Sequence, residues 1–418
     1  MSSILVESKK KARINLNQIQ DIFFFLYLLA TSAHQTGEGF DAIFIRVSFV
    51  LFVGFSILNM IATGYIKWNG FIGWFVLFLG YGYLSCLWAK SITDAMYYTN
   101  TFIQMLGCII CLTNRIKTTK DIDKILKLLL VSLLYTVLVL YIKTPVSAWG
   151  TERIGEELGI HPNDIGLRFA IGVMISLYFA ISKKIYFNYI FVALFTIIAM
   201  FSGSRKGLLM CVIAIAFYPI LSYKKKNRND FMKFLFRIIL IILITAIVYF
   251  IIMNNKMFYD VIGVRIESMI KSFEGDASAD GSINERNFYA KKAIELFKAH
   301  PIFGYGMNNF STHMAEINYH HVAYSHNNFT ELLSTLGLIG FSIYYSFVIK
   351  LVIDSIKIFF KRNDSDHQRN SLLLIFIFFS VSTSWWGMPY IDEFINITYI
   401  LVYMNNKLKH KESGKKLD

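Results

Sequence analysis

Long apolar runs are the feature that most constrains the fold of this chain of 418 residues. They recur from one end of the sequence to the other, and many approach the length of about 20 residues at which a helix crosses a bilayer. Hydrophobic residues make up 55% of the chain and charged residues only 17%. A typical soluble domain carries about 25% charged residues. We therefore predict a polytopic membrane protein built as an all-α helical bundle.

The apolar segments predict about twelve transmembrane helices. We divide the chain into an N-terminal membrane bundle at 1–253, a large polar loop at 254–327, and C-terminal spans with a basic tail at 328–418. Asn163 or Asp164 is expected to cap one of the spans. The expected spans are 20–33, 42–63, 70–88, 96–113, 123–142, 164–182, 185–201, 206–222, 234–253, 328–350, 371–388 and 393–405.

Positive charge is concentrated in alternate short loops. The chain has a net charge of +14, and the loops at 34–41 and 387–392 contain no lysine or arginine. Cationic residues mark the cytoplasmic side of a membrane protein. This pattern predicts that both termini are cytoplasmic and that the loop at 254–327 is extracytoplasmic, and it disfavours nucleic acid as a partner. The cationic clusters lie at 9–13, 115–120, 183–184, 224–233, 361–369 and from 407 onward.

The cysteines and histidines do not predict a redox or metal centre. Cys108 and Cys111 form a Cys-x-x-Cys pair, but all four cysteines fall within apolar runs and are expected to be small buried hydrophobic residues. His313, His320 and His321 have no carboxylate or cysteine at zinc-ligand spacing. Nucleotide-binding motifs are also missing from the polar loop. We expect no metal and no cofactor.

The polar loop at 254–327 is the longest segment predicted to lie outside the bilayer. Residues 284–299 predict an amphipathic helix, with Arg286 on the same face as aromatic and small residues. A His-Pro pair ends this helix, and Gly304 and Gly306 can then form a turn with positive φ. Such a helix would lie on the outer leaflet or cap a cavity.

His326, at the end of the polar loop, is the candidate catalytic residue. Asn327 follows it, and Asn328 is predicted to cap the next span with Glu331 as its capping-box partner. A helix N-terminus attracts anions and disfavours an imidazolium, so a neutral His326 at this place is suited to accept a proton. The alternative is an interfacial histidine that only bonds to loop backbone.

Four arginines are predicted on the same side of the membrane as His326. Arg205 ends a Ser-Gly-Ser-Arg turn between two apolar runs, Arg153 lies in the preceding outer loop, and Arg265 and Arg286 lie in the long loop. A guanidinium group suits phosphate oxygens. For Arg205 the alternative is a turn anchored by snorkelling cations. For Arg153 it is a solvated loop charge.

The motifs occur in a defined order along most of the chain. In this order, and on the predicted outer side, they resemble the bacterial superfamily of O-antigen polymerases and O-antigen ligases, integral membrane glycosyltransferases of the C type. The family pattern often has a glycine directly after the arginine of the turn, whereas here Lys206 precedes Gly207. The motifs are Arg153-Ile-Gly, Pro162-Asn163, Ser202 to Arg205, Arg286, His300 to Gly306, His326-Asn-Asn and Leu336 to Gly340.

The resemblance implies metal-independent, inverting transfer of a glycan from undecaprenyl pyrophosphate in the bacterial plasma (inner) membrane. Carried over to this sequence, Arg205 and Arg286 would bind the pyrophosphate and His326 would deprotonate the acceptor hydroxyl. Arg153 and Arg265 are weaker matches to the pyrophosphate ligands. The lipid bilayer and the undecaprenyl-pyrophosphate-linked glycan are the implied partners, and a chain-length regulator and a flippase are candidates.

Three functions are compatible with these residues. We favour a polymerase of lipid-linked repeat units of O-antigen, capsule or exopolysaccharide. A ligase that transfers the finished glycan to lipid A core or another acceptor would use the same donor and base, so the motifs do not separate the two enzymes. A flippase of lipid-linked sugars would need charged residues along a path through the spans. Arg46 and Arg168 lie near such positions, but most spans lack charge.

Overall fold

The computed structural model describes residues 16–64, 66–149, 153–223, 228–264, 266–267, 271, 281–316, 324–361 and 366–412. These residues form helices and contain no β-strand, so the all-α prediction is confirmed. Each of the twelve predicted spans overlaps one helix.

The main helices are α1 (Leu16–Ala33), α2 (Gly39–Thr63), α3 (Gly70–Ser85), α4 (Ile92–Arg115), α5 (Thr119–Lys143), α6 (Pro162–Ile181), α7 (Asn188–Phe201), α8 (Arg205–Leu221), α9 (Arg228–Asn254), α10 (Lys256–Phe258), α12 (Gly281–Ala299), α13 (Phe310–Glu316), α14 (Asn328–Phe359), α15 (His367–Thr383) and α16 (Glu393–Glu412). Short helical turns are η1 (Val146–Ala148), η2 (Glu156–Leu158), η3 (Tyr259–Gly263) and η4 (Pro389–Ile391).

Five of the helices in the described part of the chain are long and apolar enough to cross a bilayer: α2, α4, α5, α6 and α14. The helices α3 and α7 are apolar but shorter. Both observations support an integral membrane protein. The total of about twelve spans, and their orientation, stay predictions.

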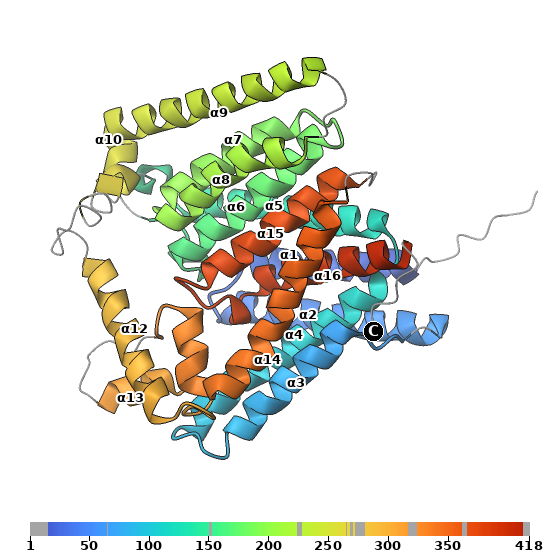
Figure 1. The fold of residues 1–418 in the computed structure, drawn as a ribbon, viewed down its shortest axis with the longest axis vertical. Helices are drawn as coiled ribbons and strands as arrows, with labels where there is room; N and C mark the ends of the chain where they lie inside the picture. The colour runs from blue at the N-terminus through green and yellow to red at the C-terminus, as the bar shows by residue number, and fades with distance from the viewer. Residues whose placement is uncertain are drawn as a thin grey trace, which may run out of the picture.

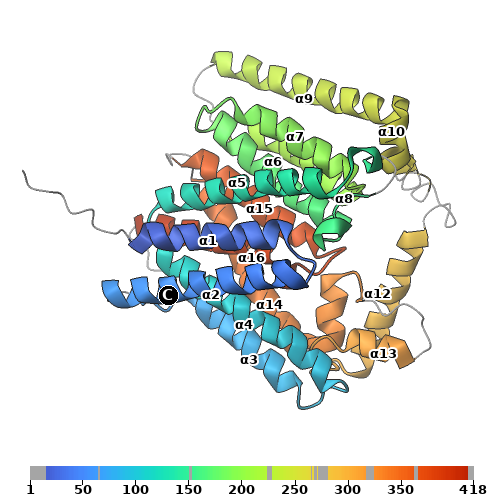
Figure 2. The same cartoon turned by 180° about the vertical axis from the view of Figure 1, so that it is seen from behind.

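The helices form one bundle, with α12 and α13 gathered at one end of it (Figure 1). Of the five long apolar helices, α6 is the most buried. It packs against α7 and α8, while α1 packs against α2 and α5. The helix α9 lies at the outside of the bundle, beyond α7 (Figure 2). The cavity described below therefore forms around the most protected helix of the molecule.

The Ser-Gly-Ser-Arg turn brings α6 and α8 into direct backbone contact. A Cβ atom added to Gly207 would lie 2.5 Å from the carbonyl carbon of Gly166, closer than any real Cβ contact. Ser204 caps α8 by accepting the Gly207 N–H at 3.1 Å, and Gly203 has a φ of 62°. The turn therefore packs closely through Gly207 although Lys206 precedes it.

We predict that Gly207→Ala lowers the free energy of unfolding by roughly 1–3 kcal/mol, because the added methyl group meets backbone that has no room to move. The measurement is chemical or thermal unfolding of the purified protein in detergent. The matched control is Gly80→Ala in α3, where an added Cβ meets nothing within 4 Å. Equal losses of stability in the two variants would contradict the close contact between α6 and α8.

The long helix α14 is broken at Gly337, which has φ 62° and ψ −166°. The break removes helical partners from backbone groups on both sides of it. The segment that follows α12 supplies replacements, so α12 is attached to α14 through backbone hydrogen bonds. These bonds run from Tyr305 N–H to Ser334 O (3.0 Å), Gly306 N–H to Thr335 O (2.7 Å), Leu338 N–H to Pro301 O (2.8 Å) and Ile339 N–H to Ile302 O (3.3 Å).

The predicted glycine turn makes this attachment possible. Gly304 and Gly306 have φ values of 67° and 97°, so the expected positive φ is confirmed. A Cβ on Gly304 would lie 2.5 Å from the Thr335 carbonyl carbon, and one on Gly306 would lie 2.5 Å from Ala89 Cβ. Both glycines hold the end of α12 against its neighbours.

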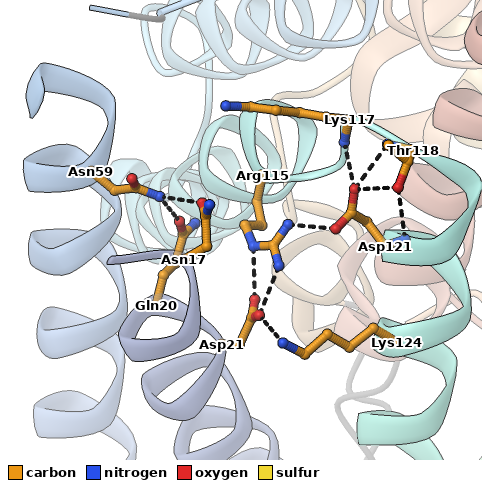
Figure 3. A network of polar contacts seen from close by, with 9 residues as sticks. All are labelled: Asn17, Gln20, Asp21, Asn59, Arg115, Lys117, Thr118, Asp121 and Lys124. Carbon is orange, nitrogen blue, oxygen red and sulfur yellow. Dashed lines mark hydrogen bonds and ion pairs between the residues drawn. The ribbon is translucent and has the colours of Figure 1, made fainter. Parts of the chain in front are cut away.

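An ion-pair network fastens the opposite end of the bundle (Figure 3). Arg115, the last residue of α4, donates to Asp21 of α1 at 2.9 and 2.7 Å and to Asp121 of α5 at 2.7 Å. Lys124 also bonds to Asp21. Since Arg115 and Asp21 are largely buried, removing one partner would leave a costly unpaired charge. Three helices are thereby fixed in register at the end where cationic residues are concentrated.

Candidate active site

A cavity of about 710 Å³ opens between α4, α6, the start of α8, α12 and the segment 383–395. It gathers ionisable side chains from parts of the chain that are far apart in sequence. Within the described ranges, no cluster of three or more histidine, cysteine or carboxylate side chains is arranged to hold a metal ion. The charged and histidine side chains that line the cavity are Arg168, Lys206, Arg286, His161, His326, Asp164, Asp392 and Glu393.

His326 is half-buried and faces this cavity. Its φ of 55° is uncommon for a residue other than glycine and often marks a functional site. Its ring lies close to those of Tyr324 and Tyr289, with centroid distances of 4.2 and 5.7 Å. The backbone and the two aromatic rings together fix the direction of the imidazole.

Burial, followed by the charges of Arg286 and Lys206 and the nearby His161, lowers the pKa of His326 to about 4. The imidazole is therefore neutral at pH 7 and carries a lone pair that can accept a proton. The sequence led to the same protonation state through the helix N-terminus. In the structure, desolvation is the largest cause of the neutral ring and the cations of the cavity are the next.

The segment around His326 is held by its neighbours, with a cap one residue earlier than predicted. Asn327, not Asn328, caps α14 and accepts two backbone N–H groups, whose donors are 2.9 and 3.3 Å away. Asn328 is buried and donates to Tyr345 at 2.7 Å. Glu331 accepts the backbone N–H of Ser325 at 2.8 Å, not that of the cap. The predicted cap was wrong by one residue, since it is the side chain of Asn327 that accepts the N–H groups of Phe329 and Thr330.

Arg286, on α12, lines the same cavity as His326. Its charge lowers the pKa of both His326 and His161, which line the same cavity. Two residues predicted from the long polar loop are therefore brought together. His161 also caps α6, with Nδ1 accepting the Asn163 N–H at 3.1 Å, so the predicted cap at Asn163 or Asp164 was wrong.

Lys206, not Arg205, lines the cavity at the start of α8. Its Nζ atom donates to the backbone carbonyl of Trp386 at 2.6 Å. The sequence did not predict Lys206 as a residue of the site, because the resemblance assigns the phosphate-binding role to the arginine before it. A second cation beside the predicted arginine, at the start of an apolar run, was the available signal.

The two remaining predicted arginines have different positions. Arg153 does not line the cavity: Nε donates to Ser202 O at 3.0 Å and Nη2 donates to Asn163 Oδ1 at 2.8 Å. It therefore joins the turn before α8 to the start of α6. Arg265 lies outside the described residues. Gly304 and Gly306 also lie away from the cavity lining and act through the attachment of α12.

Several residues deep in the cavity were not predicted as part of the site. Arg168 donates to Thr31 O at 3.0 Å and to Gln35 Oε1 at 3.2 Å. Asp392 and Glu393 come from the junction between α15 and α16, which the sequence placed in a short outer loop and the start of a span. Their signal in the sequence was weak because two acidic residues beside a span also suit an ordinary loop end.

Part of the chain matches a known family. The sequence profile of a family described as O-antigen ligase matches residues 190–345. This range contains α8, α12, the segment around His326 and the break in α14. No curated protein matches the chain.

Proposed function

The chain belongs to the superfamily of O-antigen ligases and O-antigen polymerases, and from this premise we propose that it polymerises repeat units carried on undecaprenyl pyrophosphate. The observation that supports this most strongly is the single cavity that holds a neutral His326 beside Arg286 and Lys206. In this proposal 254–327 is the catalytic loop, and 1–253 and 328–418 form the membrane part. The family resemblance favours the bacterial plasma membrane, and the charge pattern favours cytoplasmic termini.

His326 is the proposed general base. It accepts the proton of an acceptor sugar hydroxyl while the hydroxyl oxygen forms a bond to the anomeric carbon of the donor. The bond from that carbon to the pyrophosphate oxygen breaks, and its electron pair leaves with undecaprenyl pyrophosphate. Attack opposite the leaving group inverts the anomeric centre. A neutral imidazole is the protonation state that this step requires.

Arg286 and Lys206 are the proposed pyrophosphate ligands. Negative charge grows on the leaving oxygen as the bond breaks, and two fixed cations in a partly buried site stabilise it more in the transition state than in the donor. Lys206 takes the position inside the cavity that the resemblance gave to Arg205. Arg153 is a positioning residue in this scheme because it holds the turn that carries both Arg205 and Lys206.

The pKa of His326 sets the expected pH dependence. Since the base acts when deprotonated, the transfer rate should fall as the pH approaches about 4. Lys206→Gln removes a neighbouring cation, so the pKa should rise toward the ordinary 6.5 and the acid limb should move to higher pH. Initial rates of the purified protein across this range test the shift. If the fall in rate at low pH occurs at the same pH in the variant, Lys206 does not lower the pKa of the base.

A ligase is the second candidate, favoured by the description of the matching family. Deletion of the gene distinguishes the two enzymes. Accumulation of single lipid-linked repeats would support the polymerase, whereas accumulation of long lipid-linked chains would support the ligase. Product formation by purified protein in liposomes, with donor lipid extracted from the deletion strain, tests catalysis against transport. Movement of the lipid without a new glycosidic bond would overturn the enzymatic proposal.

A further inference from the structure

We propose that the inner part of the cavity binds the sugar that is joined to the donor pyrophosphate. This cavity floor consists of Tyr27 on α1, Gln104 on α4, and Asp392 and Glu393 at the start of α16. The inference rests on the proposed function, since it assigns a second part of the same substrate to the same cavity. It assigns donor specificity to residues outside the polar loop.

The floor lies well inside the bundle. The start of α4 lies beside α13, where Thr312 donates to Asp94 at 3.0 Å. Gln104 is twelve residues beyond Ile92, roughly 18 Å along the helix. Glu393 Oε1 lies 3.9 Å from Cys108 Sγ, one further turn along α4. The cavity therefore extends from His326 and Arg286 at the α12 end to the inner part of the bundle.

The connection between α15 and α16 forms one wall of the cavity and extends to its floor. The segment from Ser384 to Asp392, between α15 and α16, contributes Trp386, Met388 and Pro389 to the cavity lining. Non-helical backbone inside a membrane bundle is stable where it lines a hydrated cavity. A hydrated inner chamber suits a ligand with many hydroxyl groups better than it suits a lipid chain.

The polar groups of the floor suit a sugar. Asp392 and Glu393 are adjacent carboxyl groups that can form hydrogen bonds with hydroxyl groups whether or not they are protonated. The neighbouring cation, Arg168, is only 7% exposed and is bound to backbone and amide oxygens of the wall. Its Nε atom lines up with no hydrogen-bond acceptor among the described residues, which leaves one buried donor for a ligand oxygen or water.

The two parts of the cavity thus suit different parts of one donor molecule. Lys206 and Arg286 attract the pyrophosphate, and the floor accepts hydroxyl groups. A cavity of about 710 Å³ lies within the size range of small-molecule sites, about 300–1,000 Å³. A donor bound with its pyrophosphate between the cations and its first sugar on the floor would place the anomeric carbon between them, on the side of His326.

Binding measurements on the full chain in nanodiscs test this assignment with two probes. One is undecaprenyl pyrophosphate without sugar, and the other is the glycan-bearing donor lipid extracted from a strain that lacks the gene. Gln104→Leu and Asp392→Asn should each weaken binding of the glycan-bearing lipid about tenfold, the effect of losing a hydrogen bond or two. Binding of undecaprenyl pyrophosphate should change less than about twofold in the same variants, a difference near the precision of such measurements.

Two controls accompany these variants. Asn100→Leu changes an exposed residue of α4 that does not line the cavity and should alter neither affinity. Lys206→Gln should weaken both lipids. Equal losses for both lipids in the floor variants, or an unchanged affinity for the glycan-bearing lipid, would overturn the sugar site while the proposed function stands. If the unaltered protein binds neither lipid, the proposed function fails and the sugar site fails with it.

Discussion

Replacing His326 with alanine should leave a folded, membrane-inserted protein whose glycan transfer rate is lower by roughly 10²–10⁴-fold, the usual contribution of a general base. The reason is geometric and electrostatic: His326 is a neutral imidazole that faces the cavity beside Arg286 and Lys206. The measurements are the glycan ladder in the native strain and the initial rate of purified protein in liposomes.

Two further variants make this result interpretable. His326→Asn keeps a residue that tolerates the positive φ of 55° but removes the base, so it separates the chemical role from backbone strain. His300→Ala changes an exposed histidine at the end of α12 that does not line the cavity, and it should retain activity. Long chains produced by an inserted His326→Asn protein would rule out His326 as the base.

The second large effect is expected at the cations. Arg286→Ala and Lys206→Ala should each reduce the transfer rate by roughly 10²–10³-fold, as happens when one donor to a developing negative charge is removed. Arg205→Ala should cost less, because Arg205 does not line the cavity. Steady-state kinetics with extracted donor lipid measure all three changes.

A matched control for charge alone is Lys292→Ala. Lys292 is a cation on the same helix as Arg286, it pairs with Glu295 at 2.7 Å, and it does not line the cavity. Its loss should leave the rate nearly unchanged. If Arg205→Ala lowers the transfer rate more than Lys206→Ala does, Arg205 is the pyrophosphate ligand, as the resemblance implied.

The helices could be predicted from the sequence because each apolar run carries its own signal. The break at Gly337 could not, since residues 328–350 have the hydropathy of a single span and the break is stabilised by a segment about 30 residues earlier in the chain. Hydropathy reports on burial and is insensitive to which backbone groups bond to each other. The positive φ of Gly304 and Gly306 was foreseen, but the surface they contact was not.

The candidate site shows the same division. His326 and Arg286 could be predicted because each is a polar residue with a local reason to lie outside the bilayer. The choice between Arg205 and Lys206 depends on which face of α8 meets the cavity. Consecutive residues on a helix point about 100° apart, and only the contact with α6 at Gly207 fixes that face. Asp392 and Glu393 could not be predicted as residues of the site, because their position depends on the path of the chain after α15.

The break in α14 has a consequence for how the proposed base and one proposed cation are held relative to each other. The four backbone hydrogen bonds around Gly337 join the end of α12 to both halves of α14. Arg286 sits on α12 and His326 directly precedes α14, so these bonds and the packing of α12 against α14 connect the two elements that carry the side chains. Their separation is then set when the chain folds and need not be assembled again at each catalytic cycle, which lowers the entropic cost of reaching the reactive geometry.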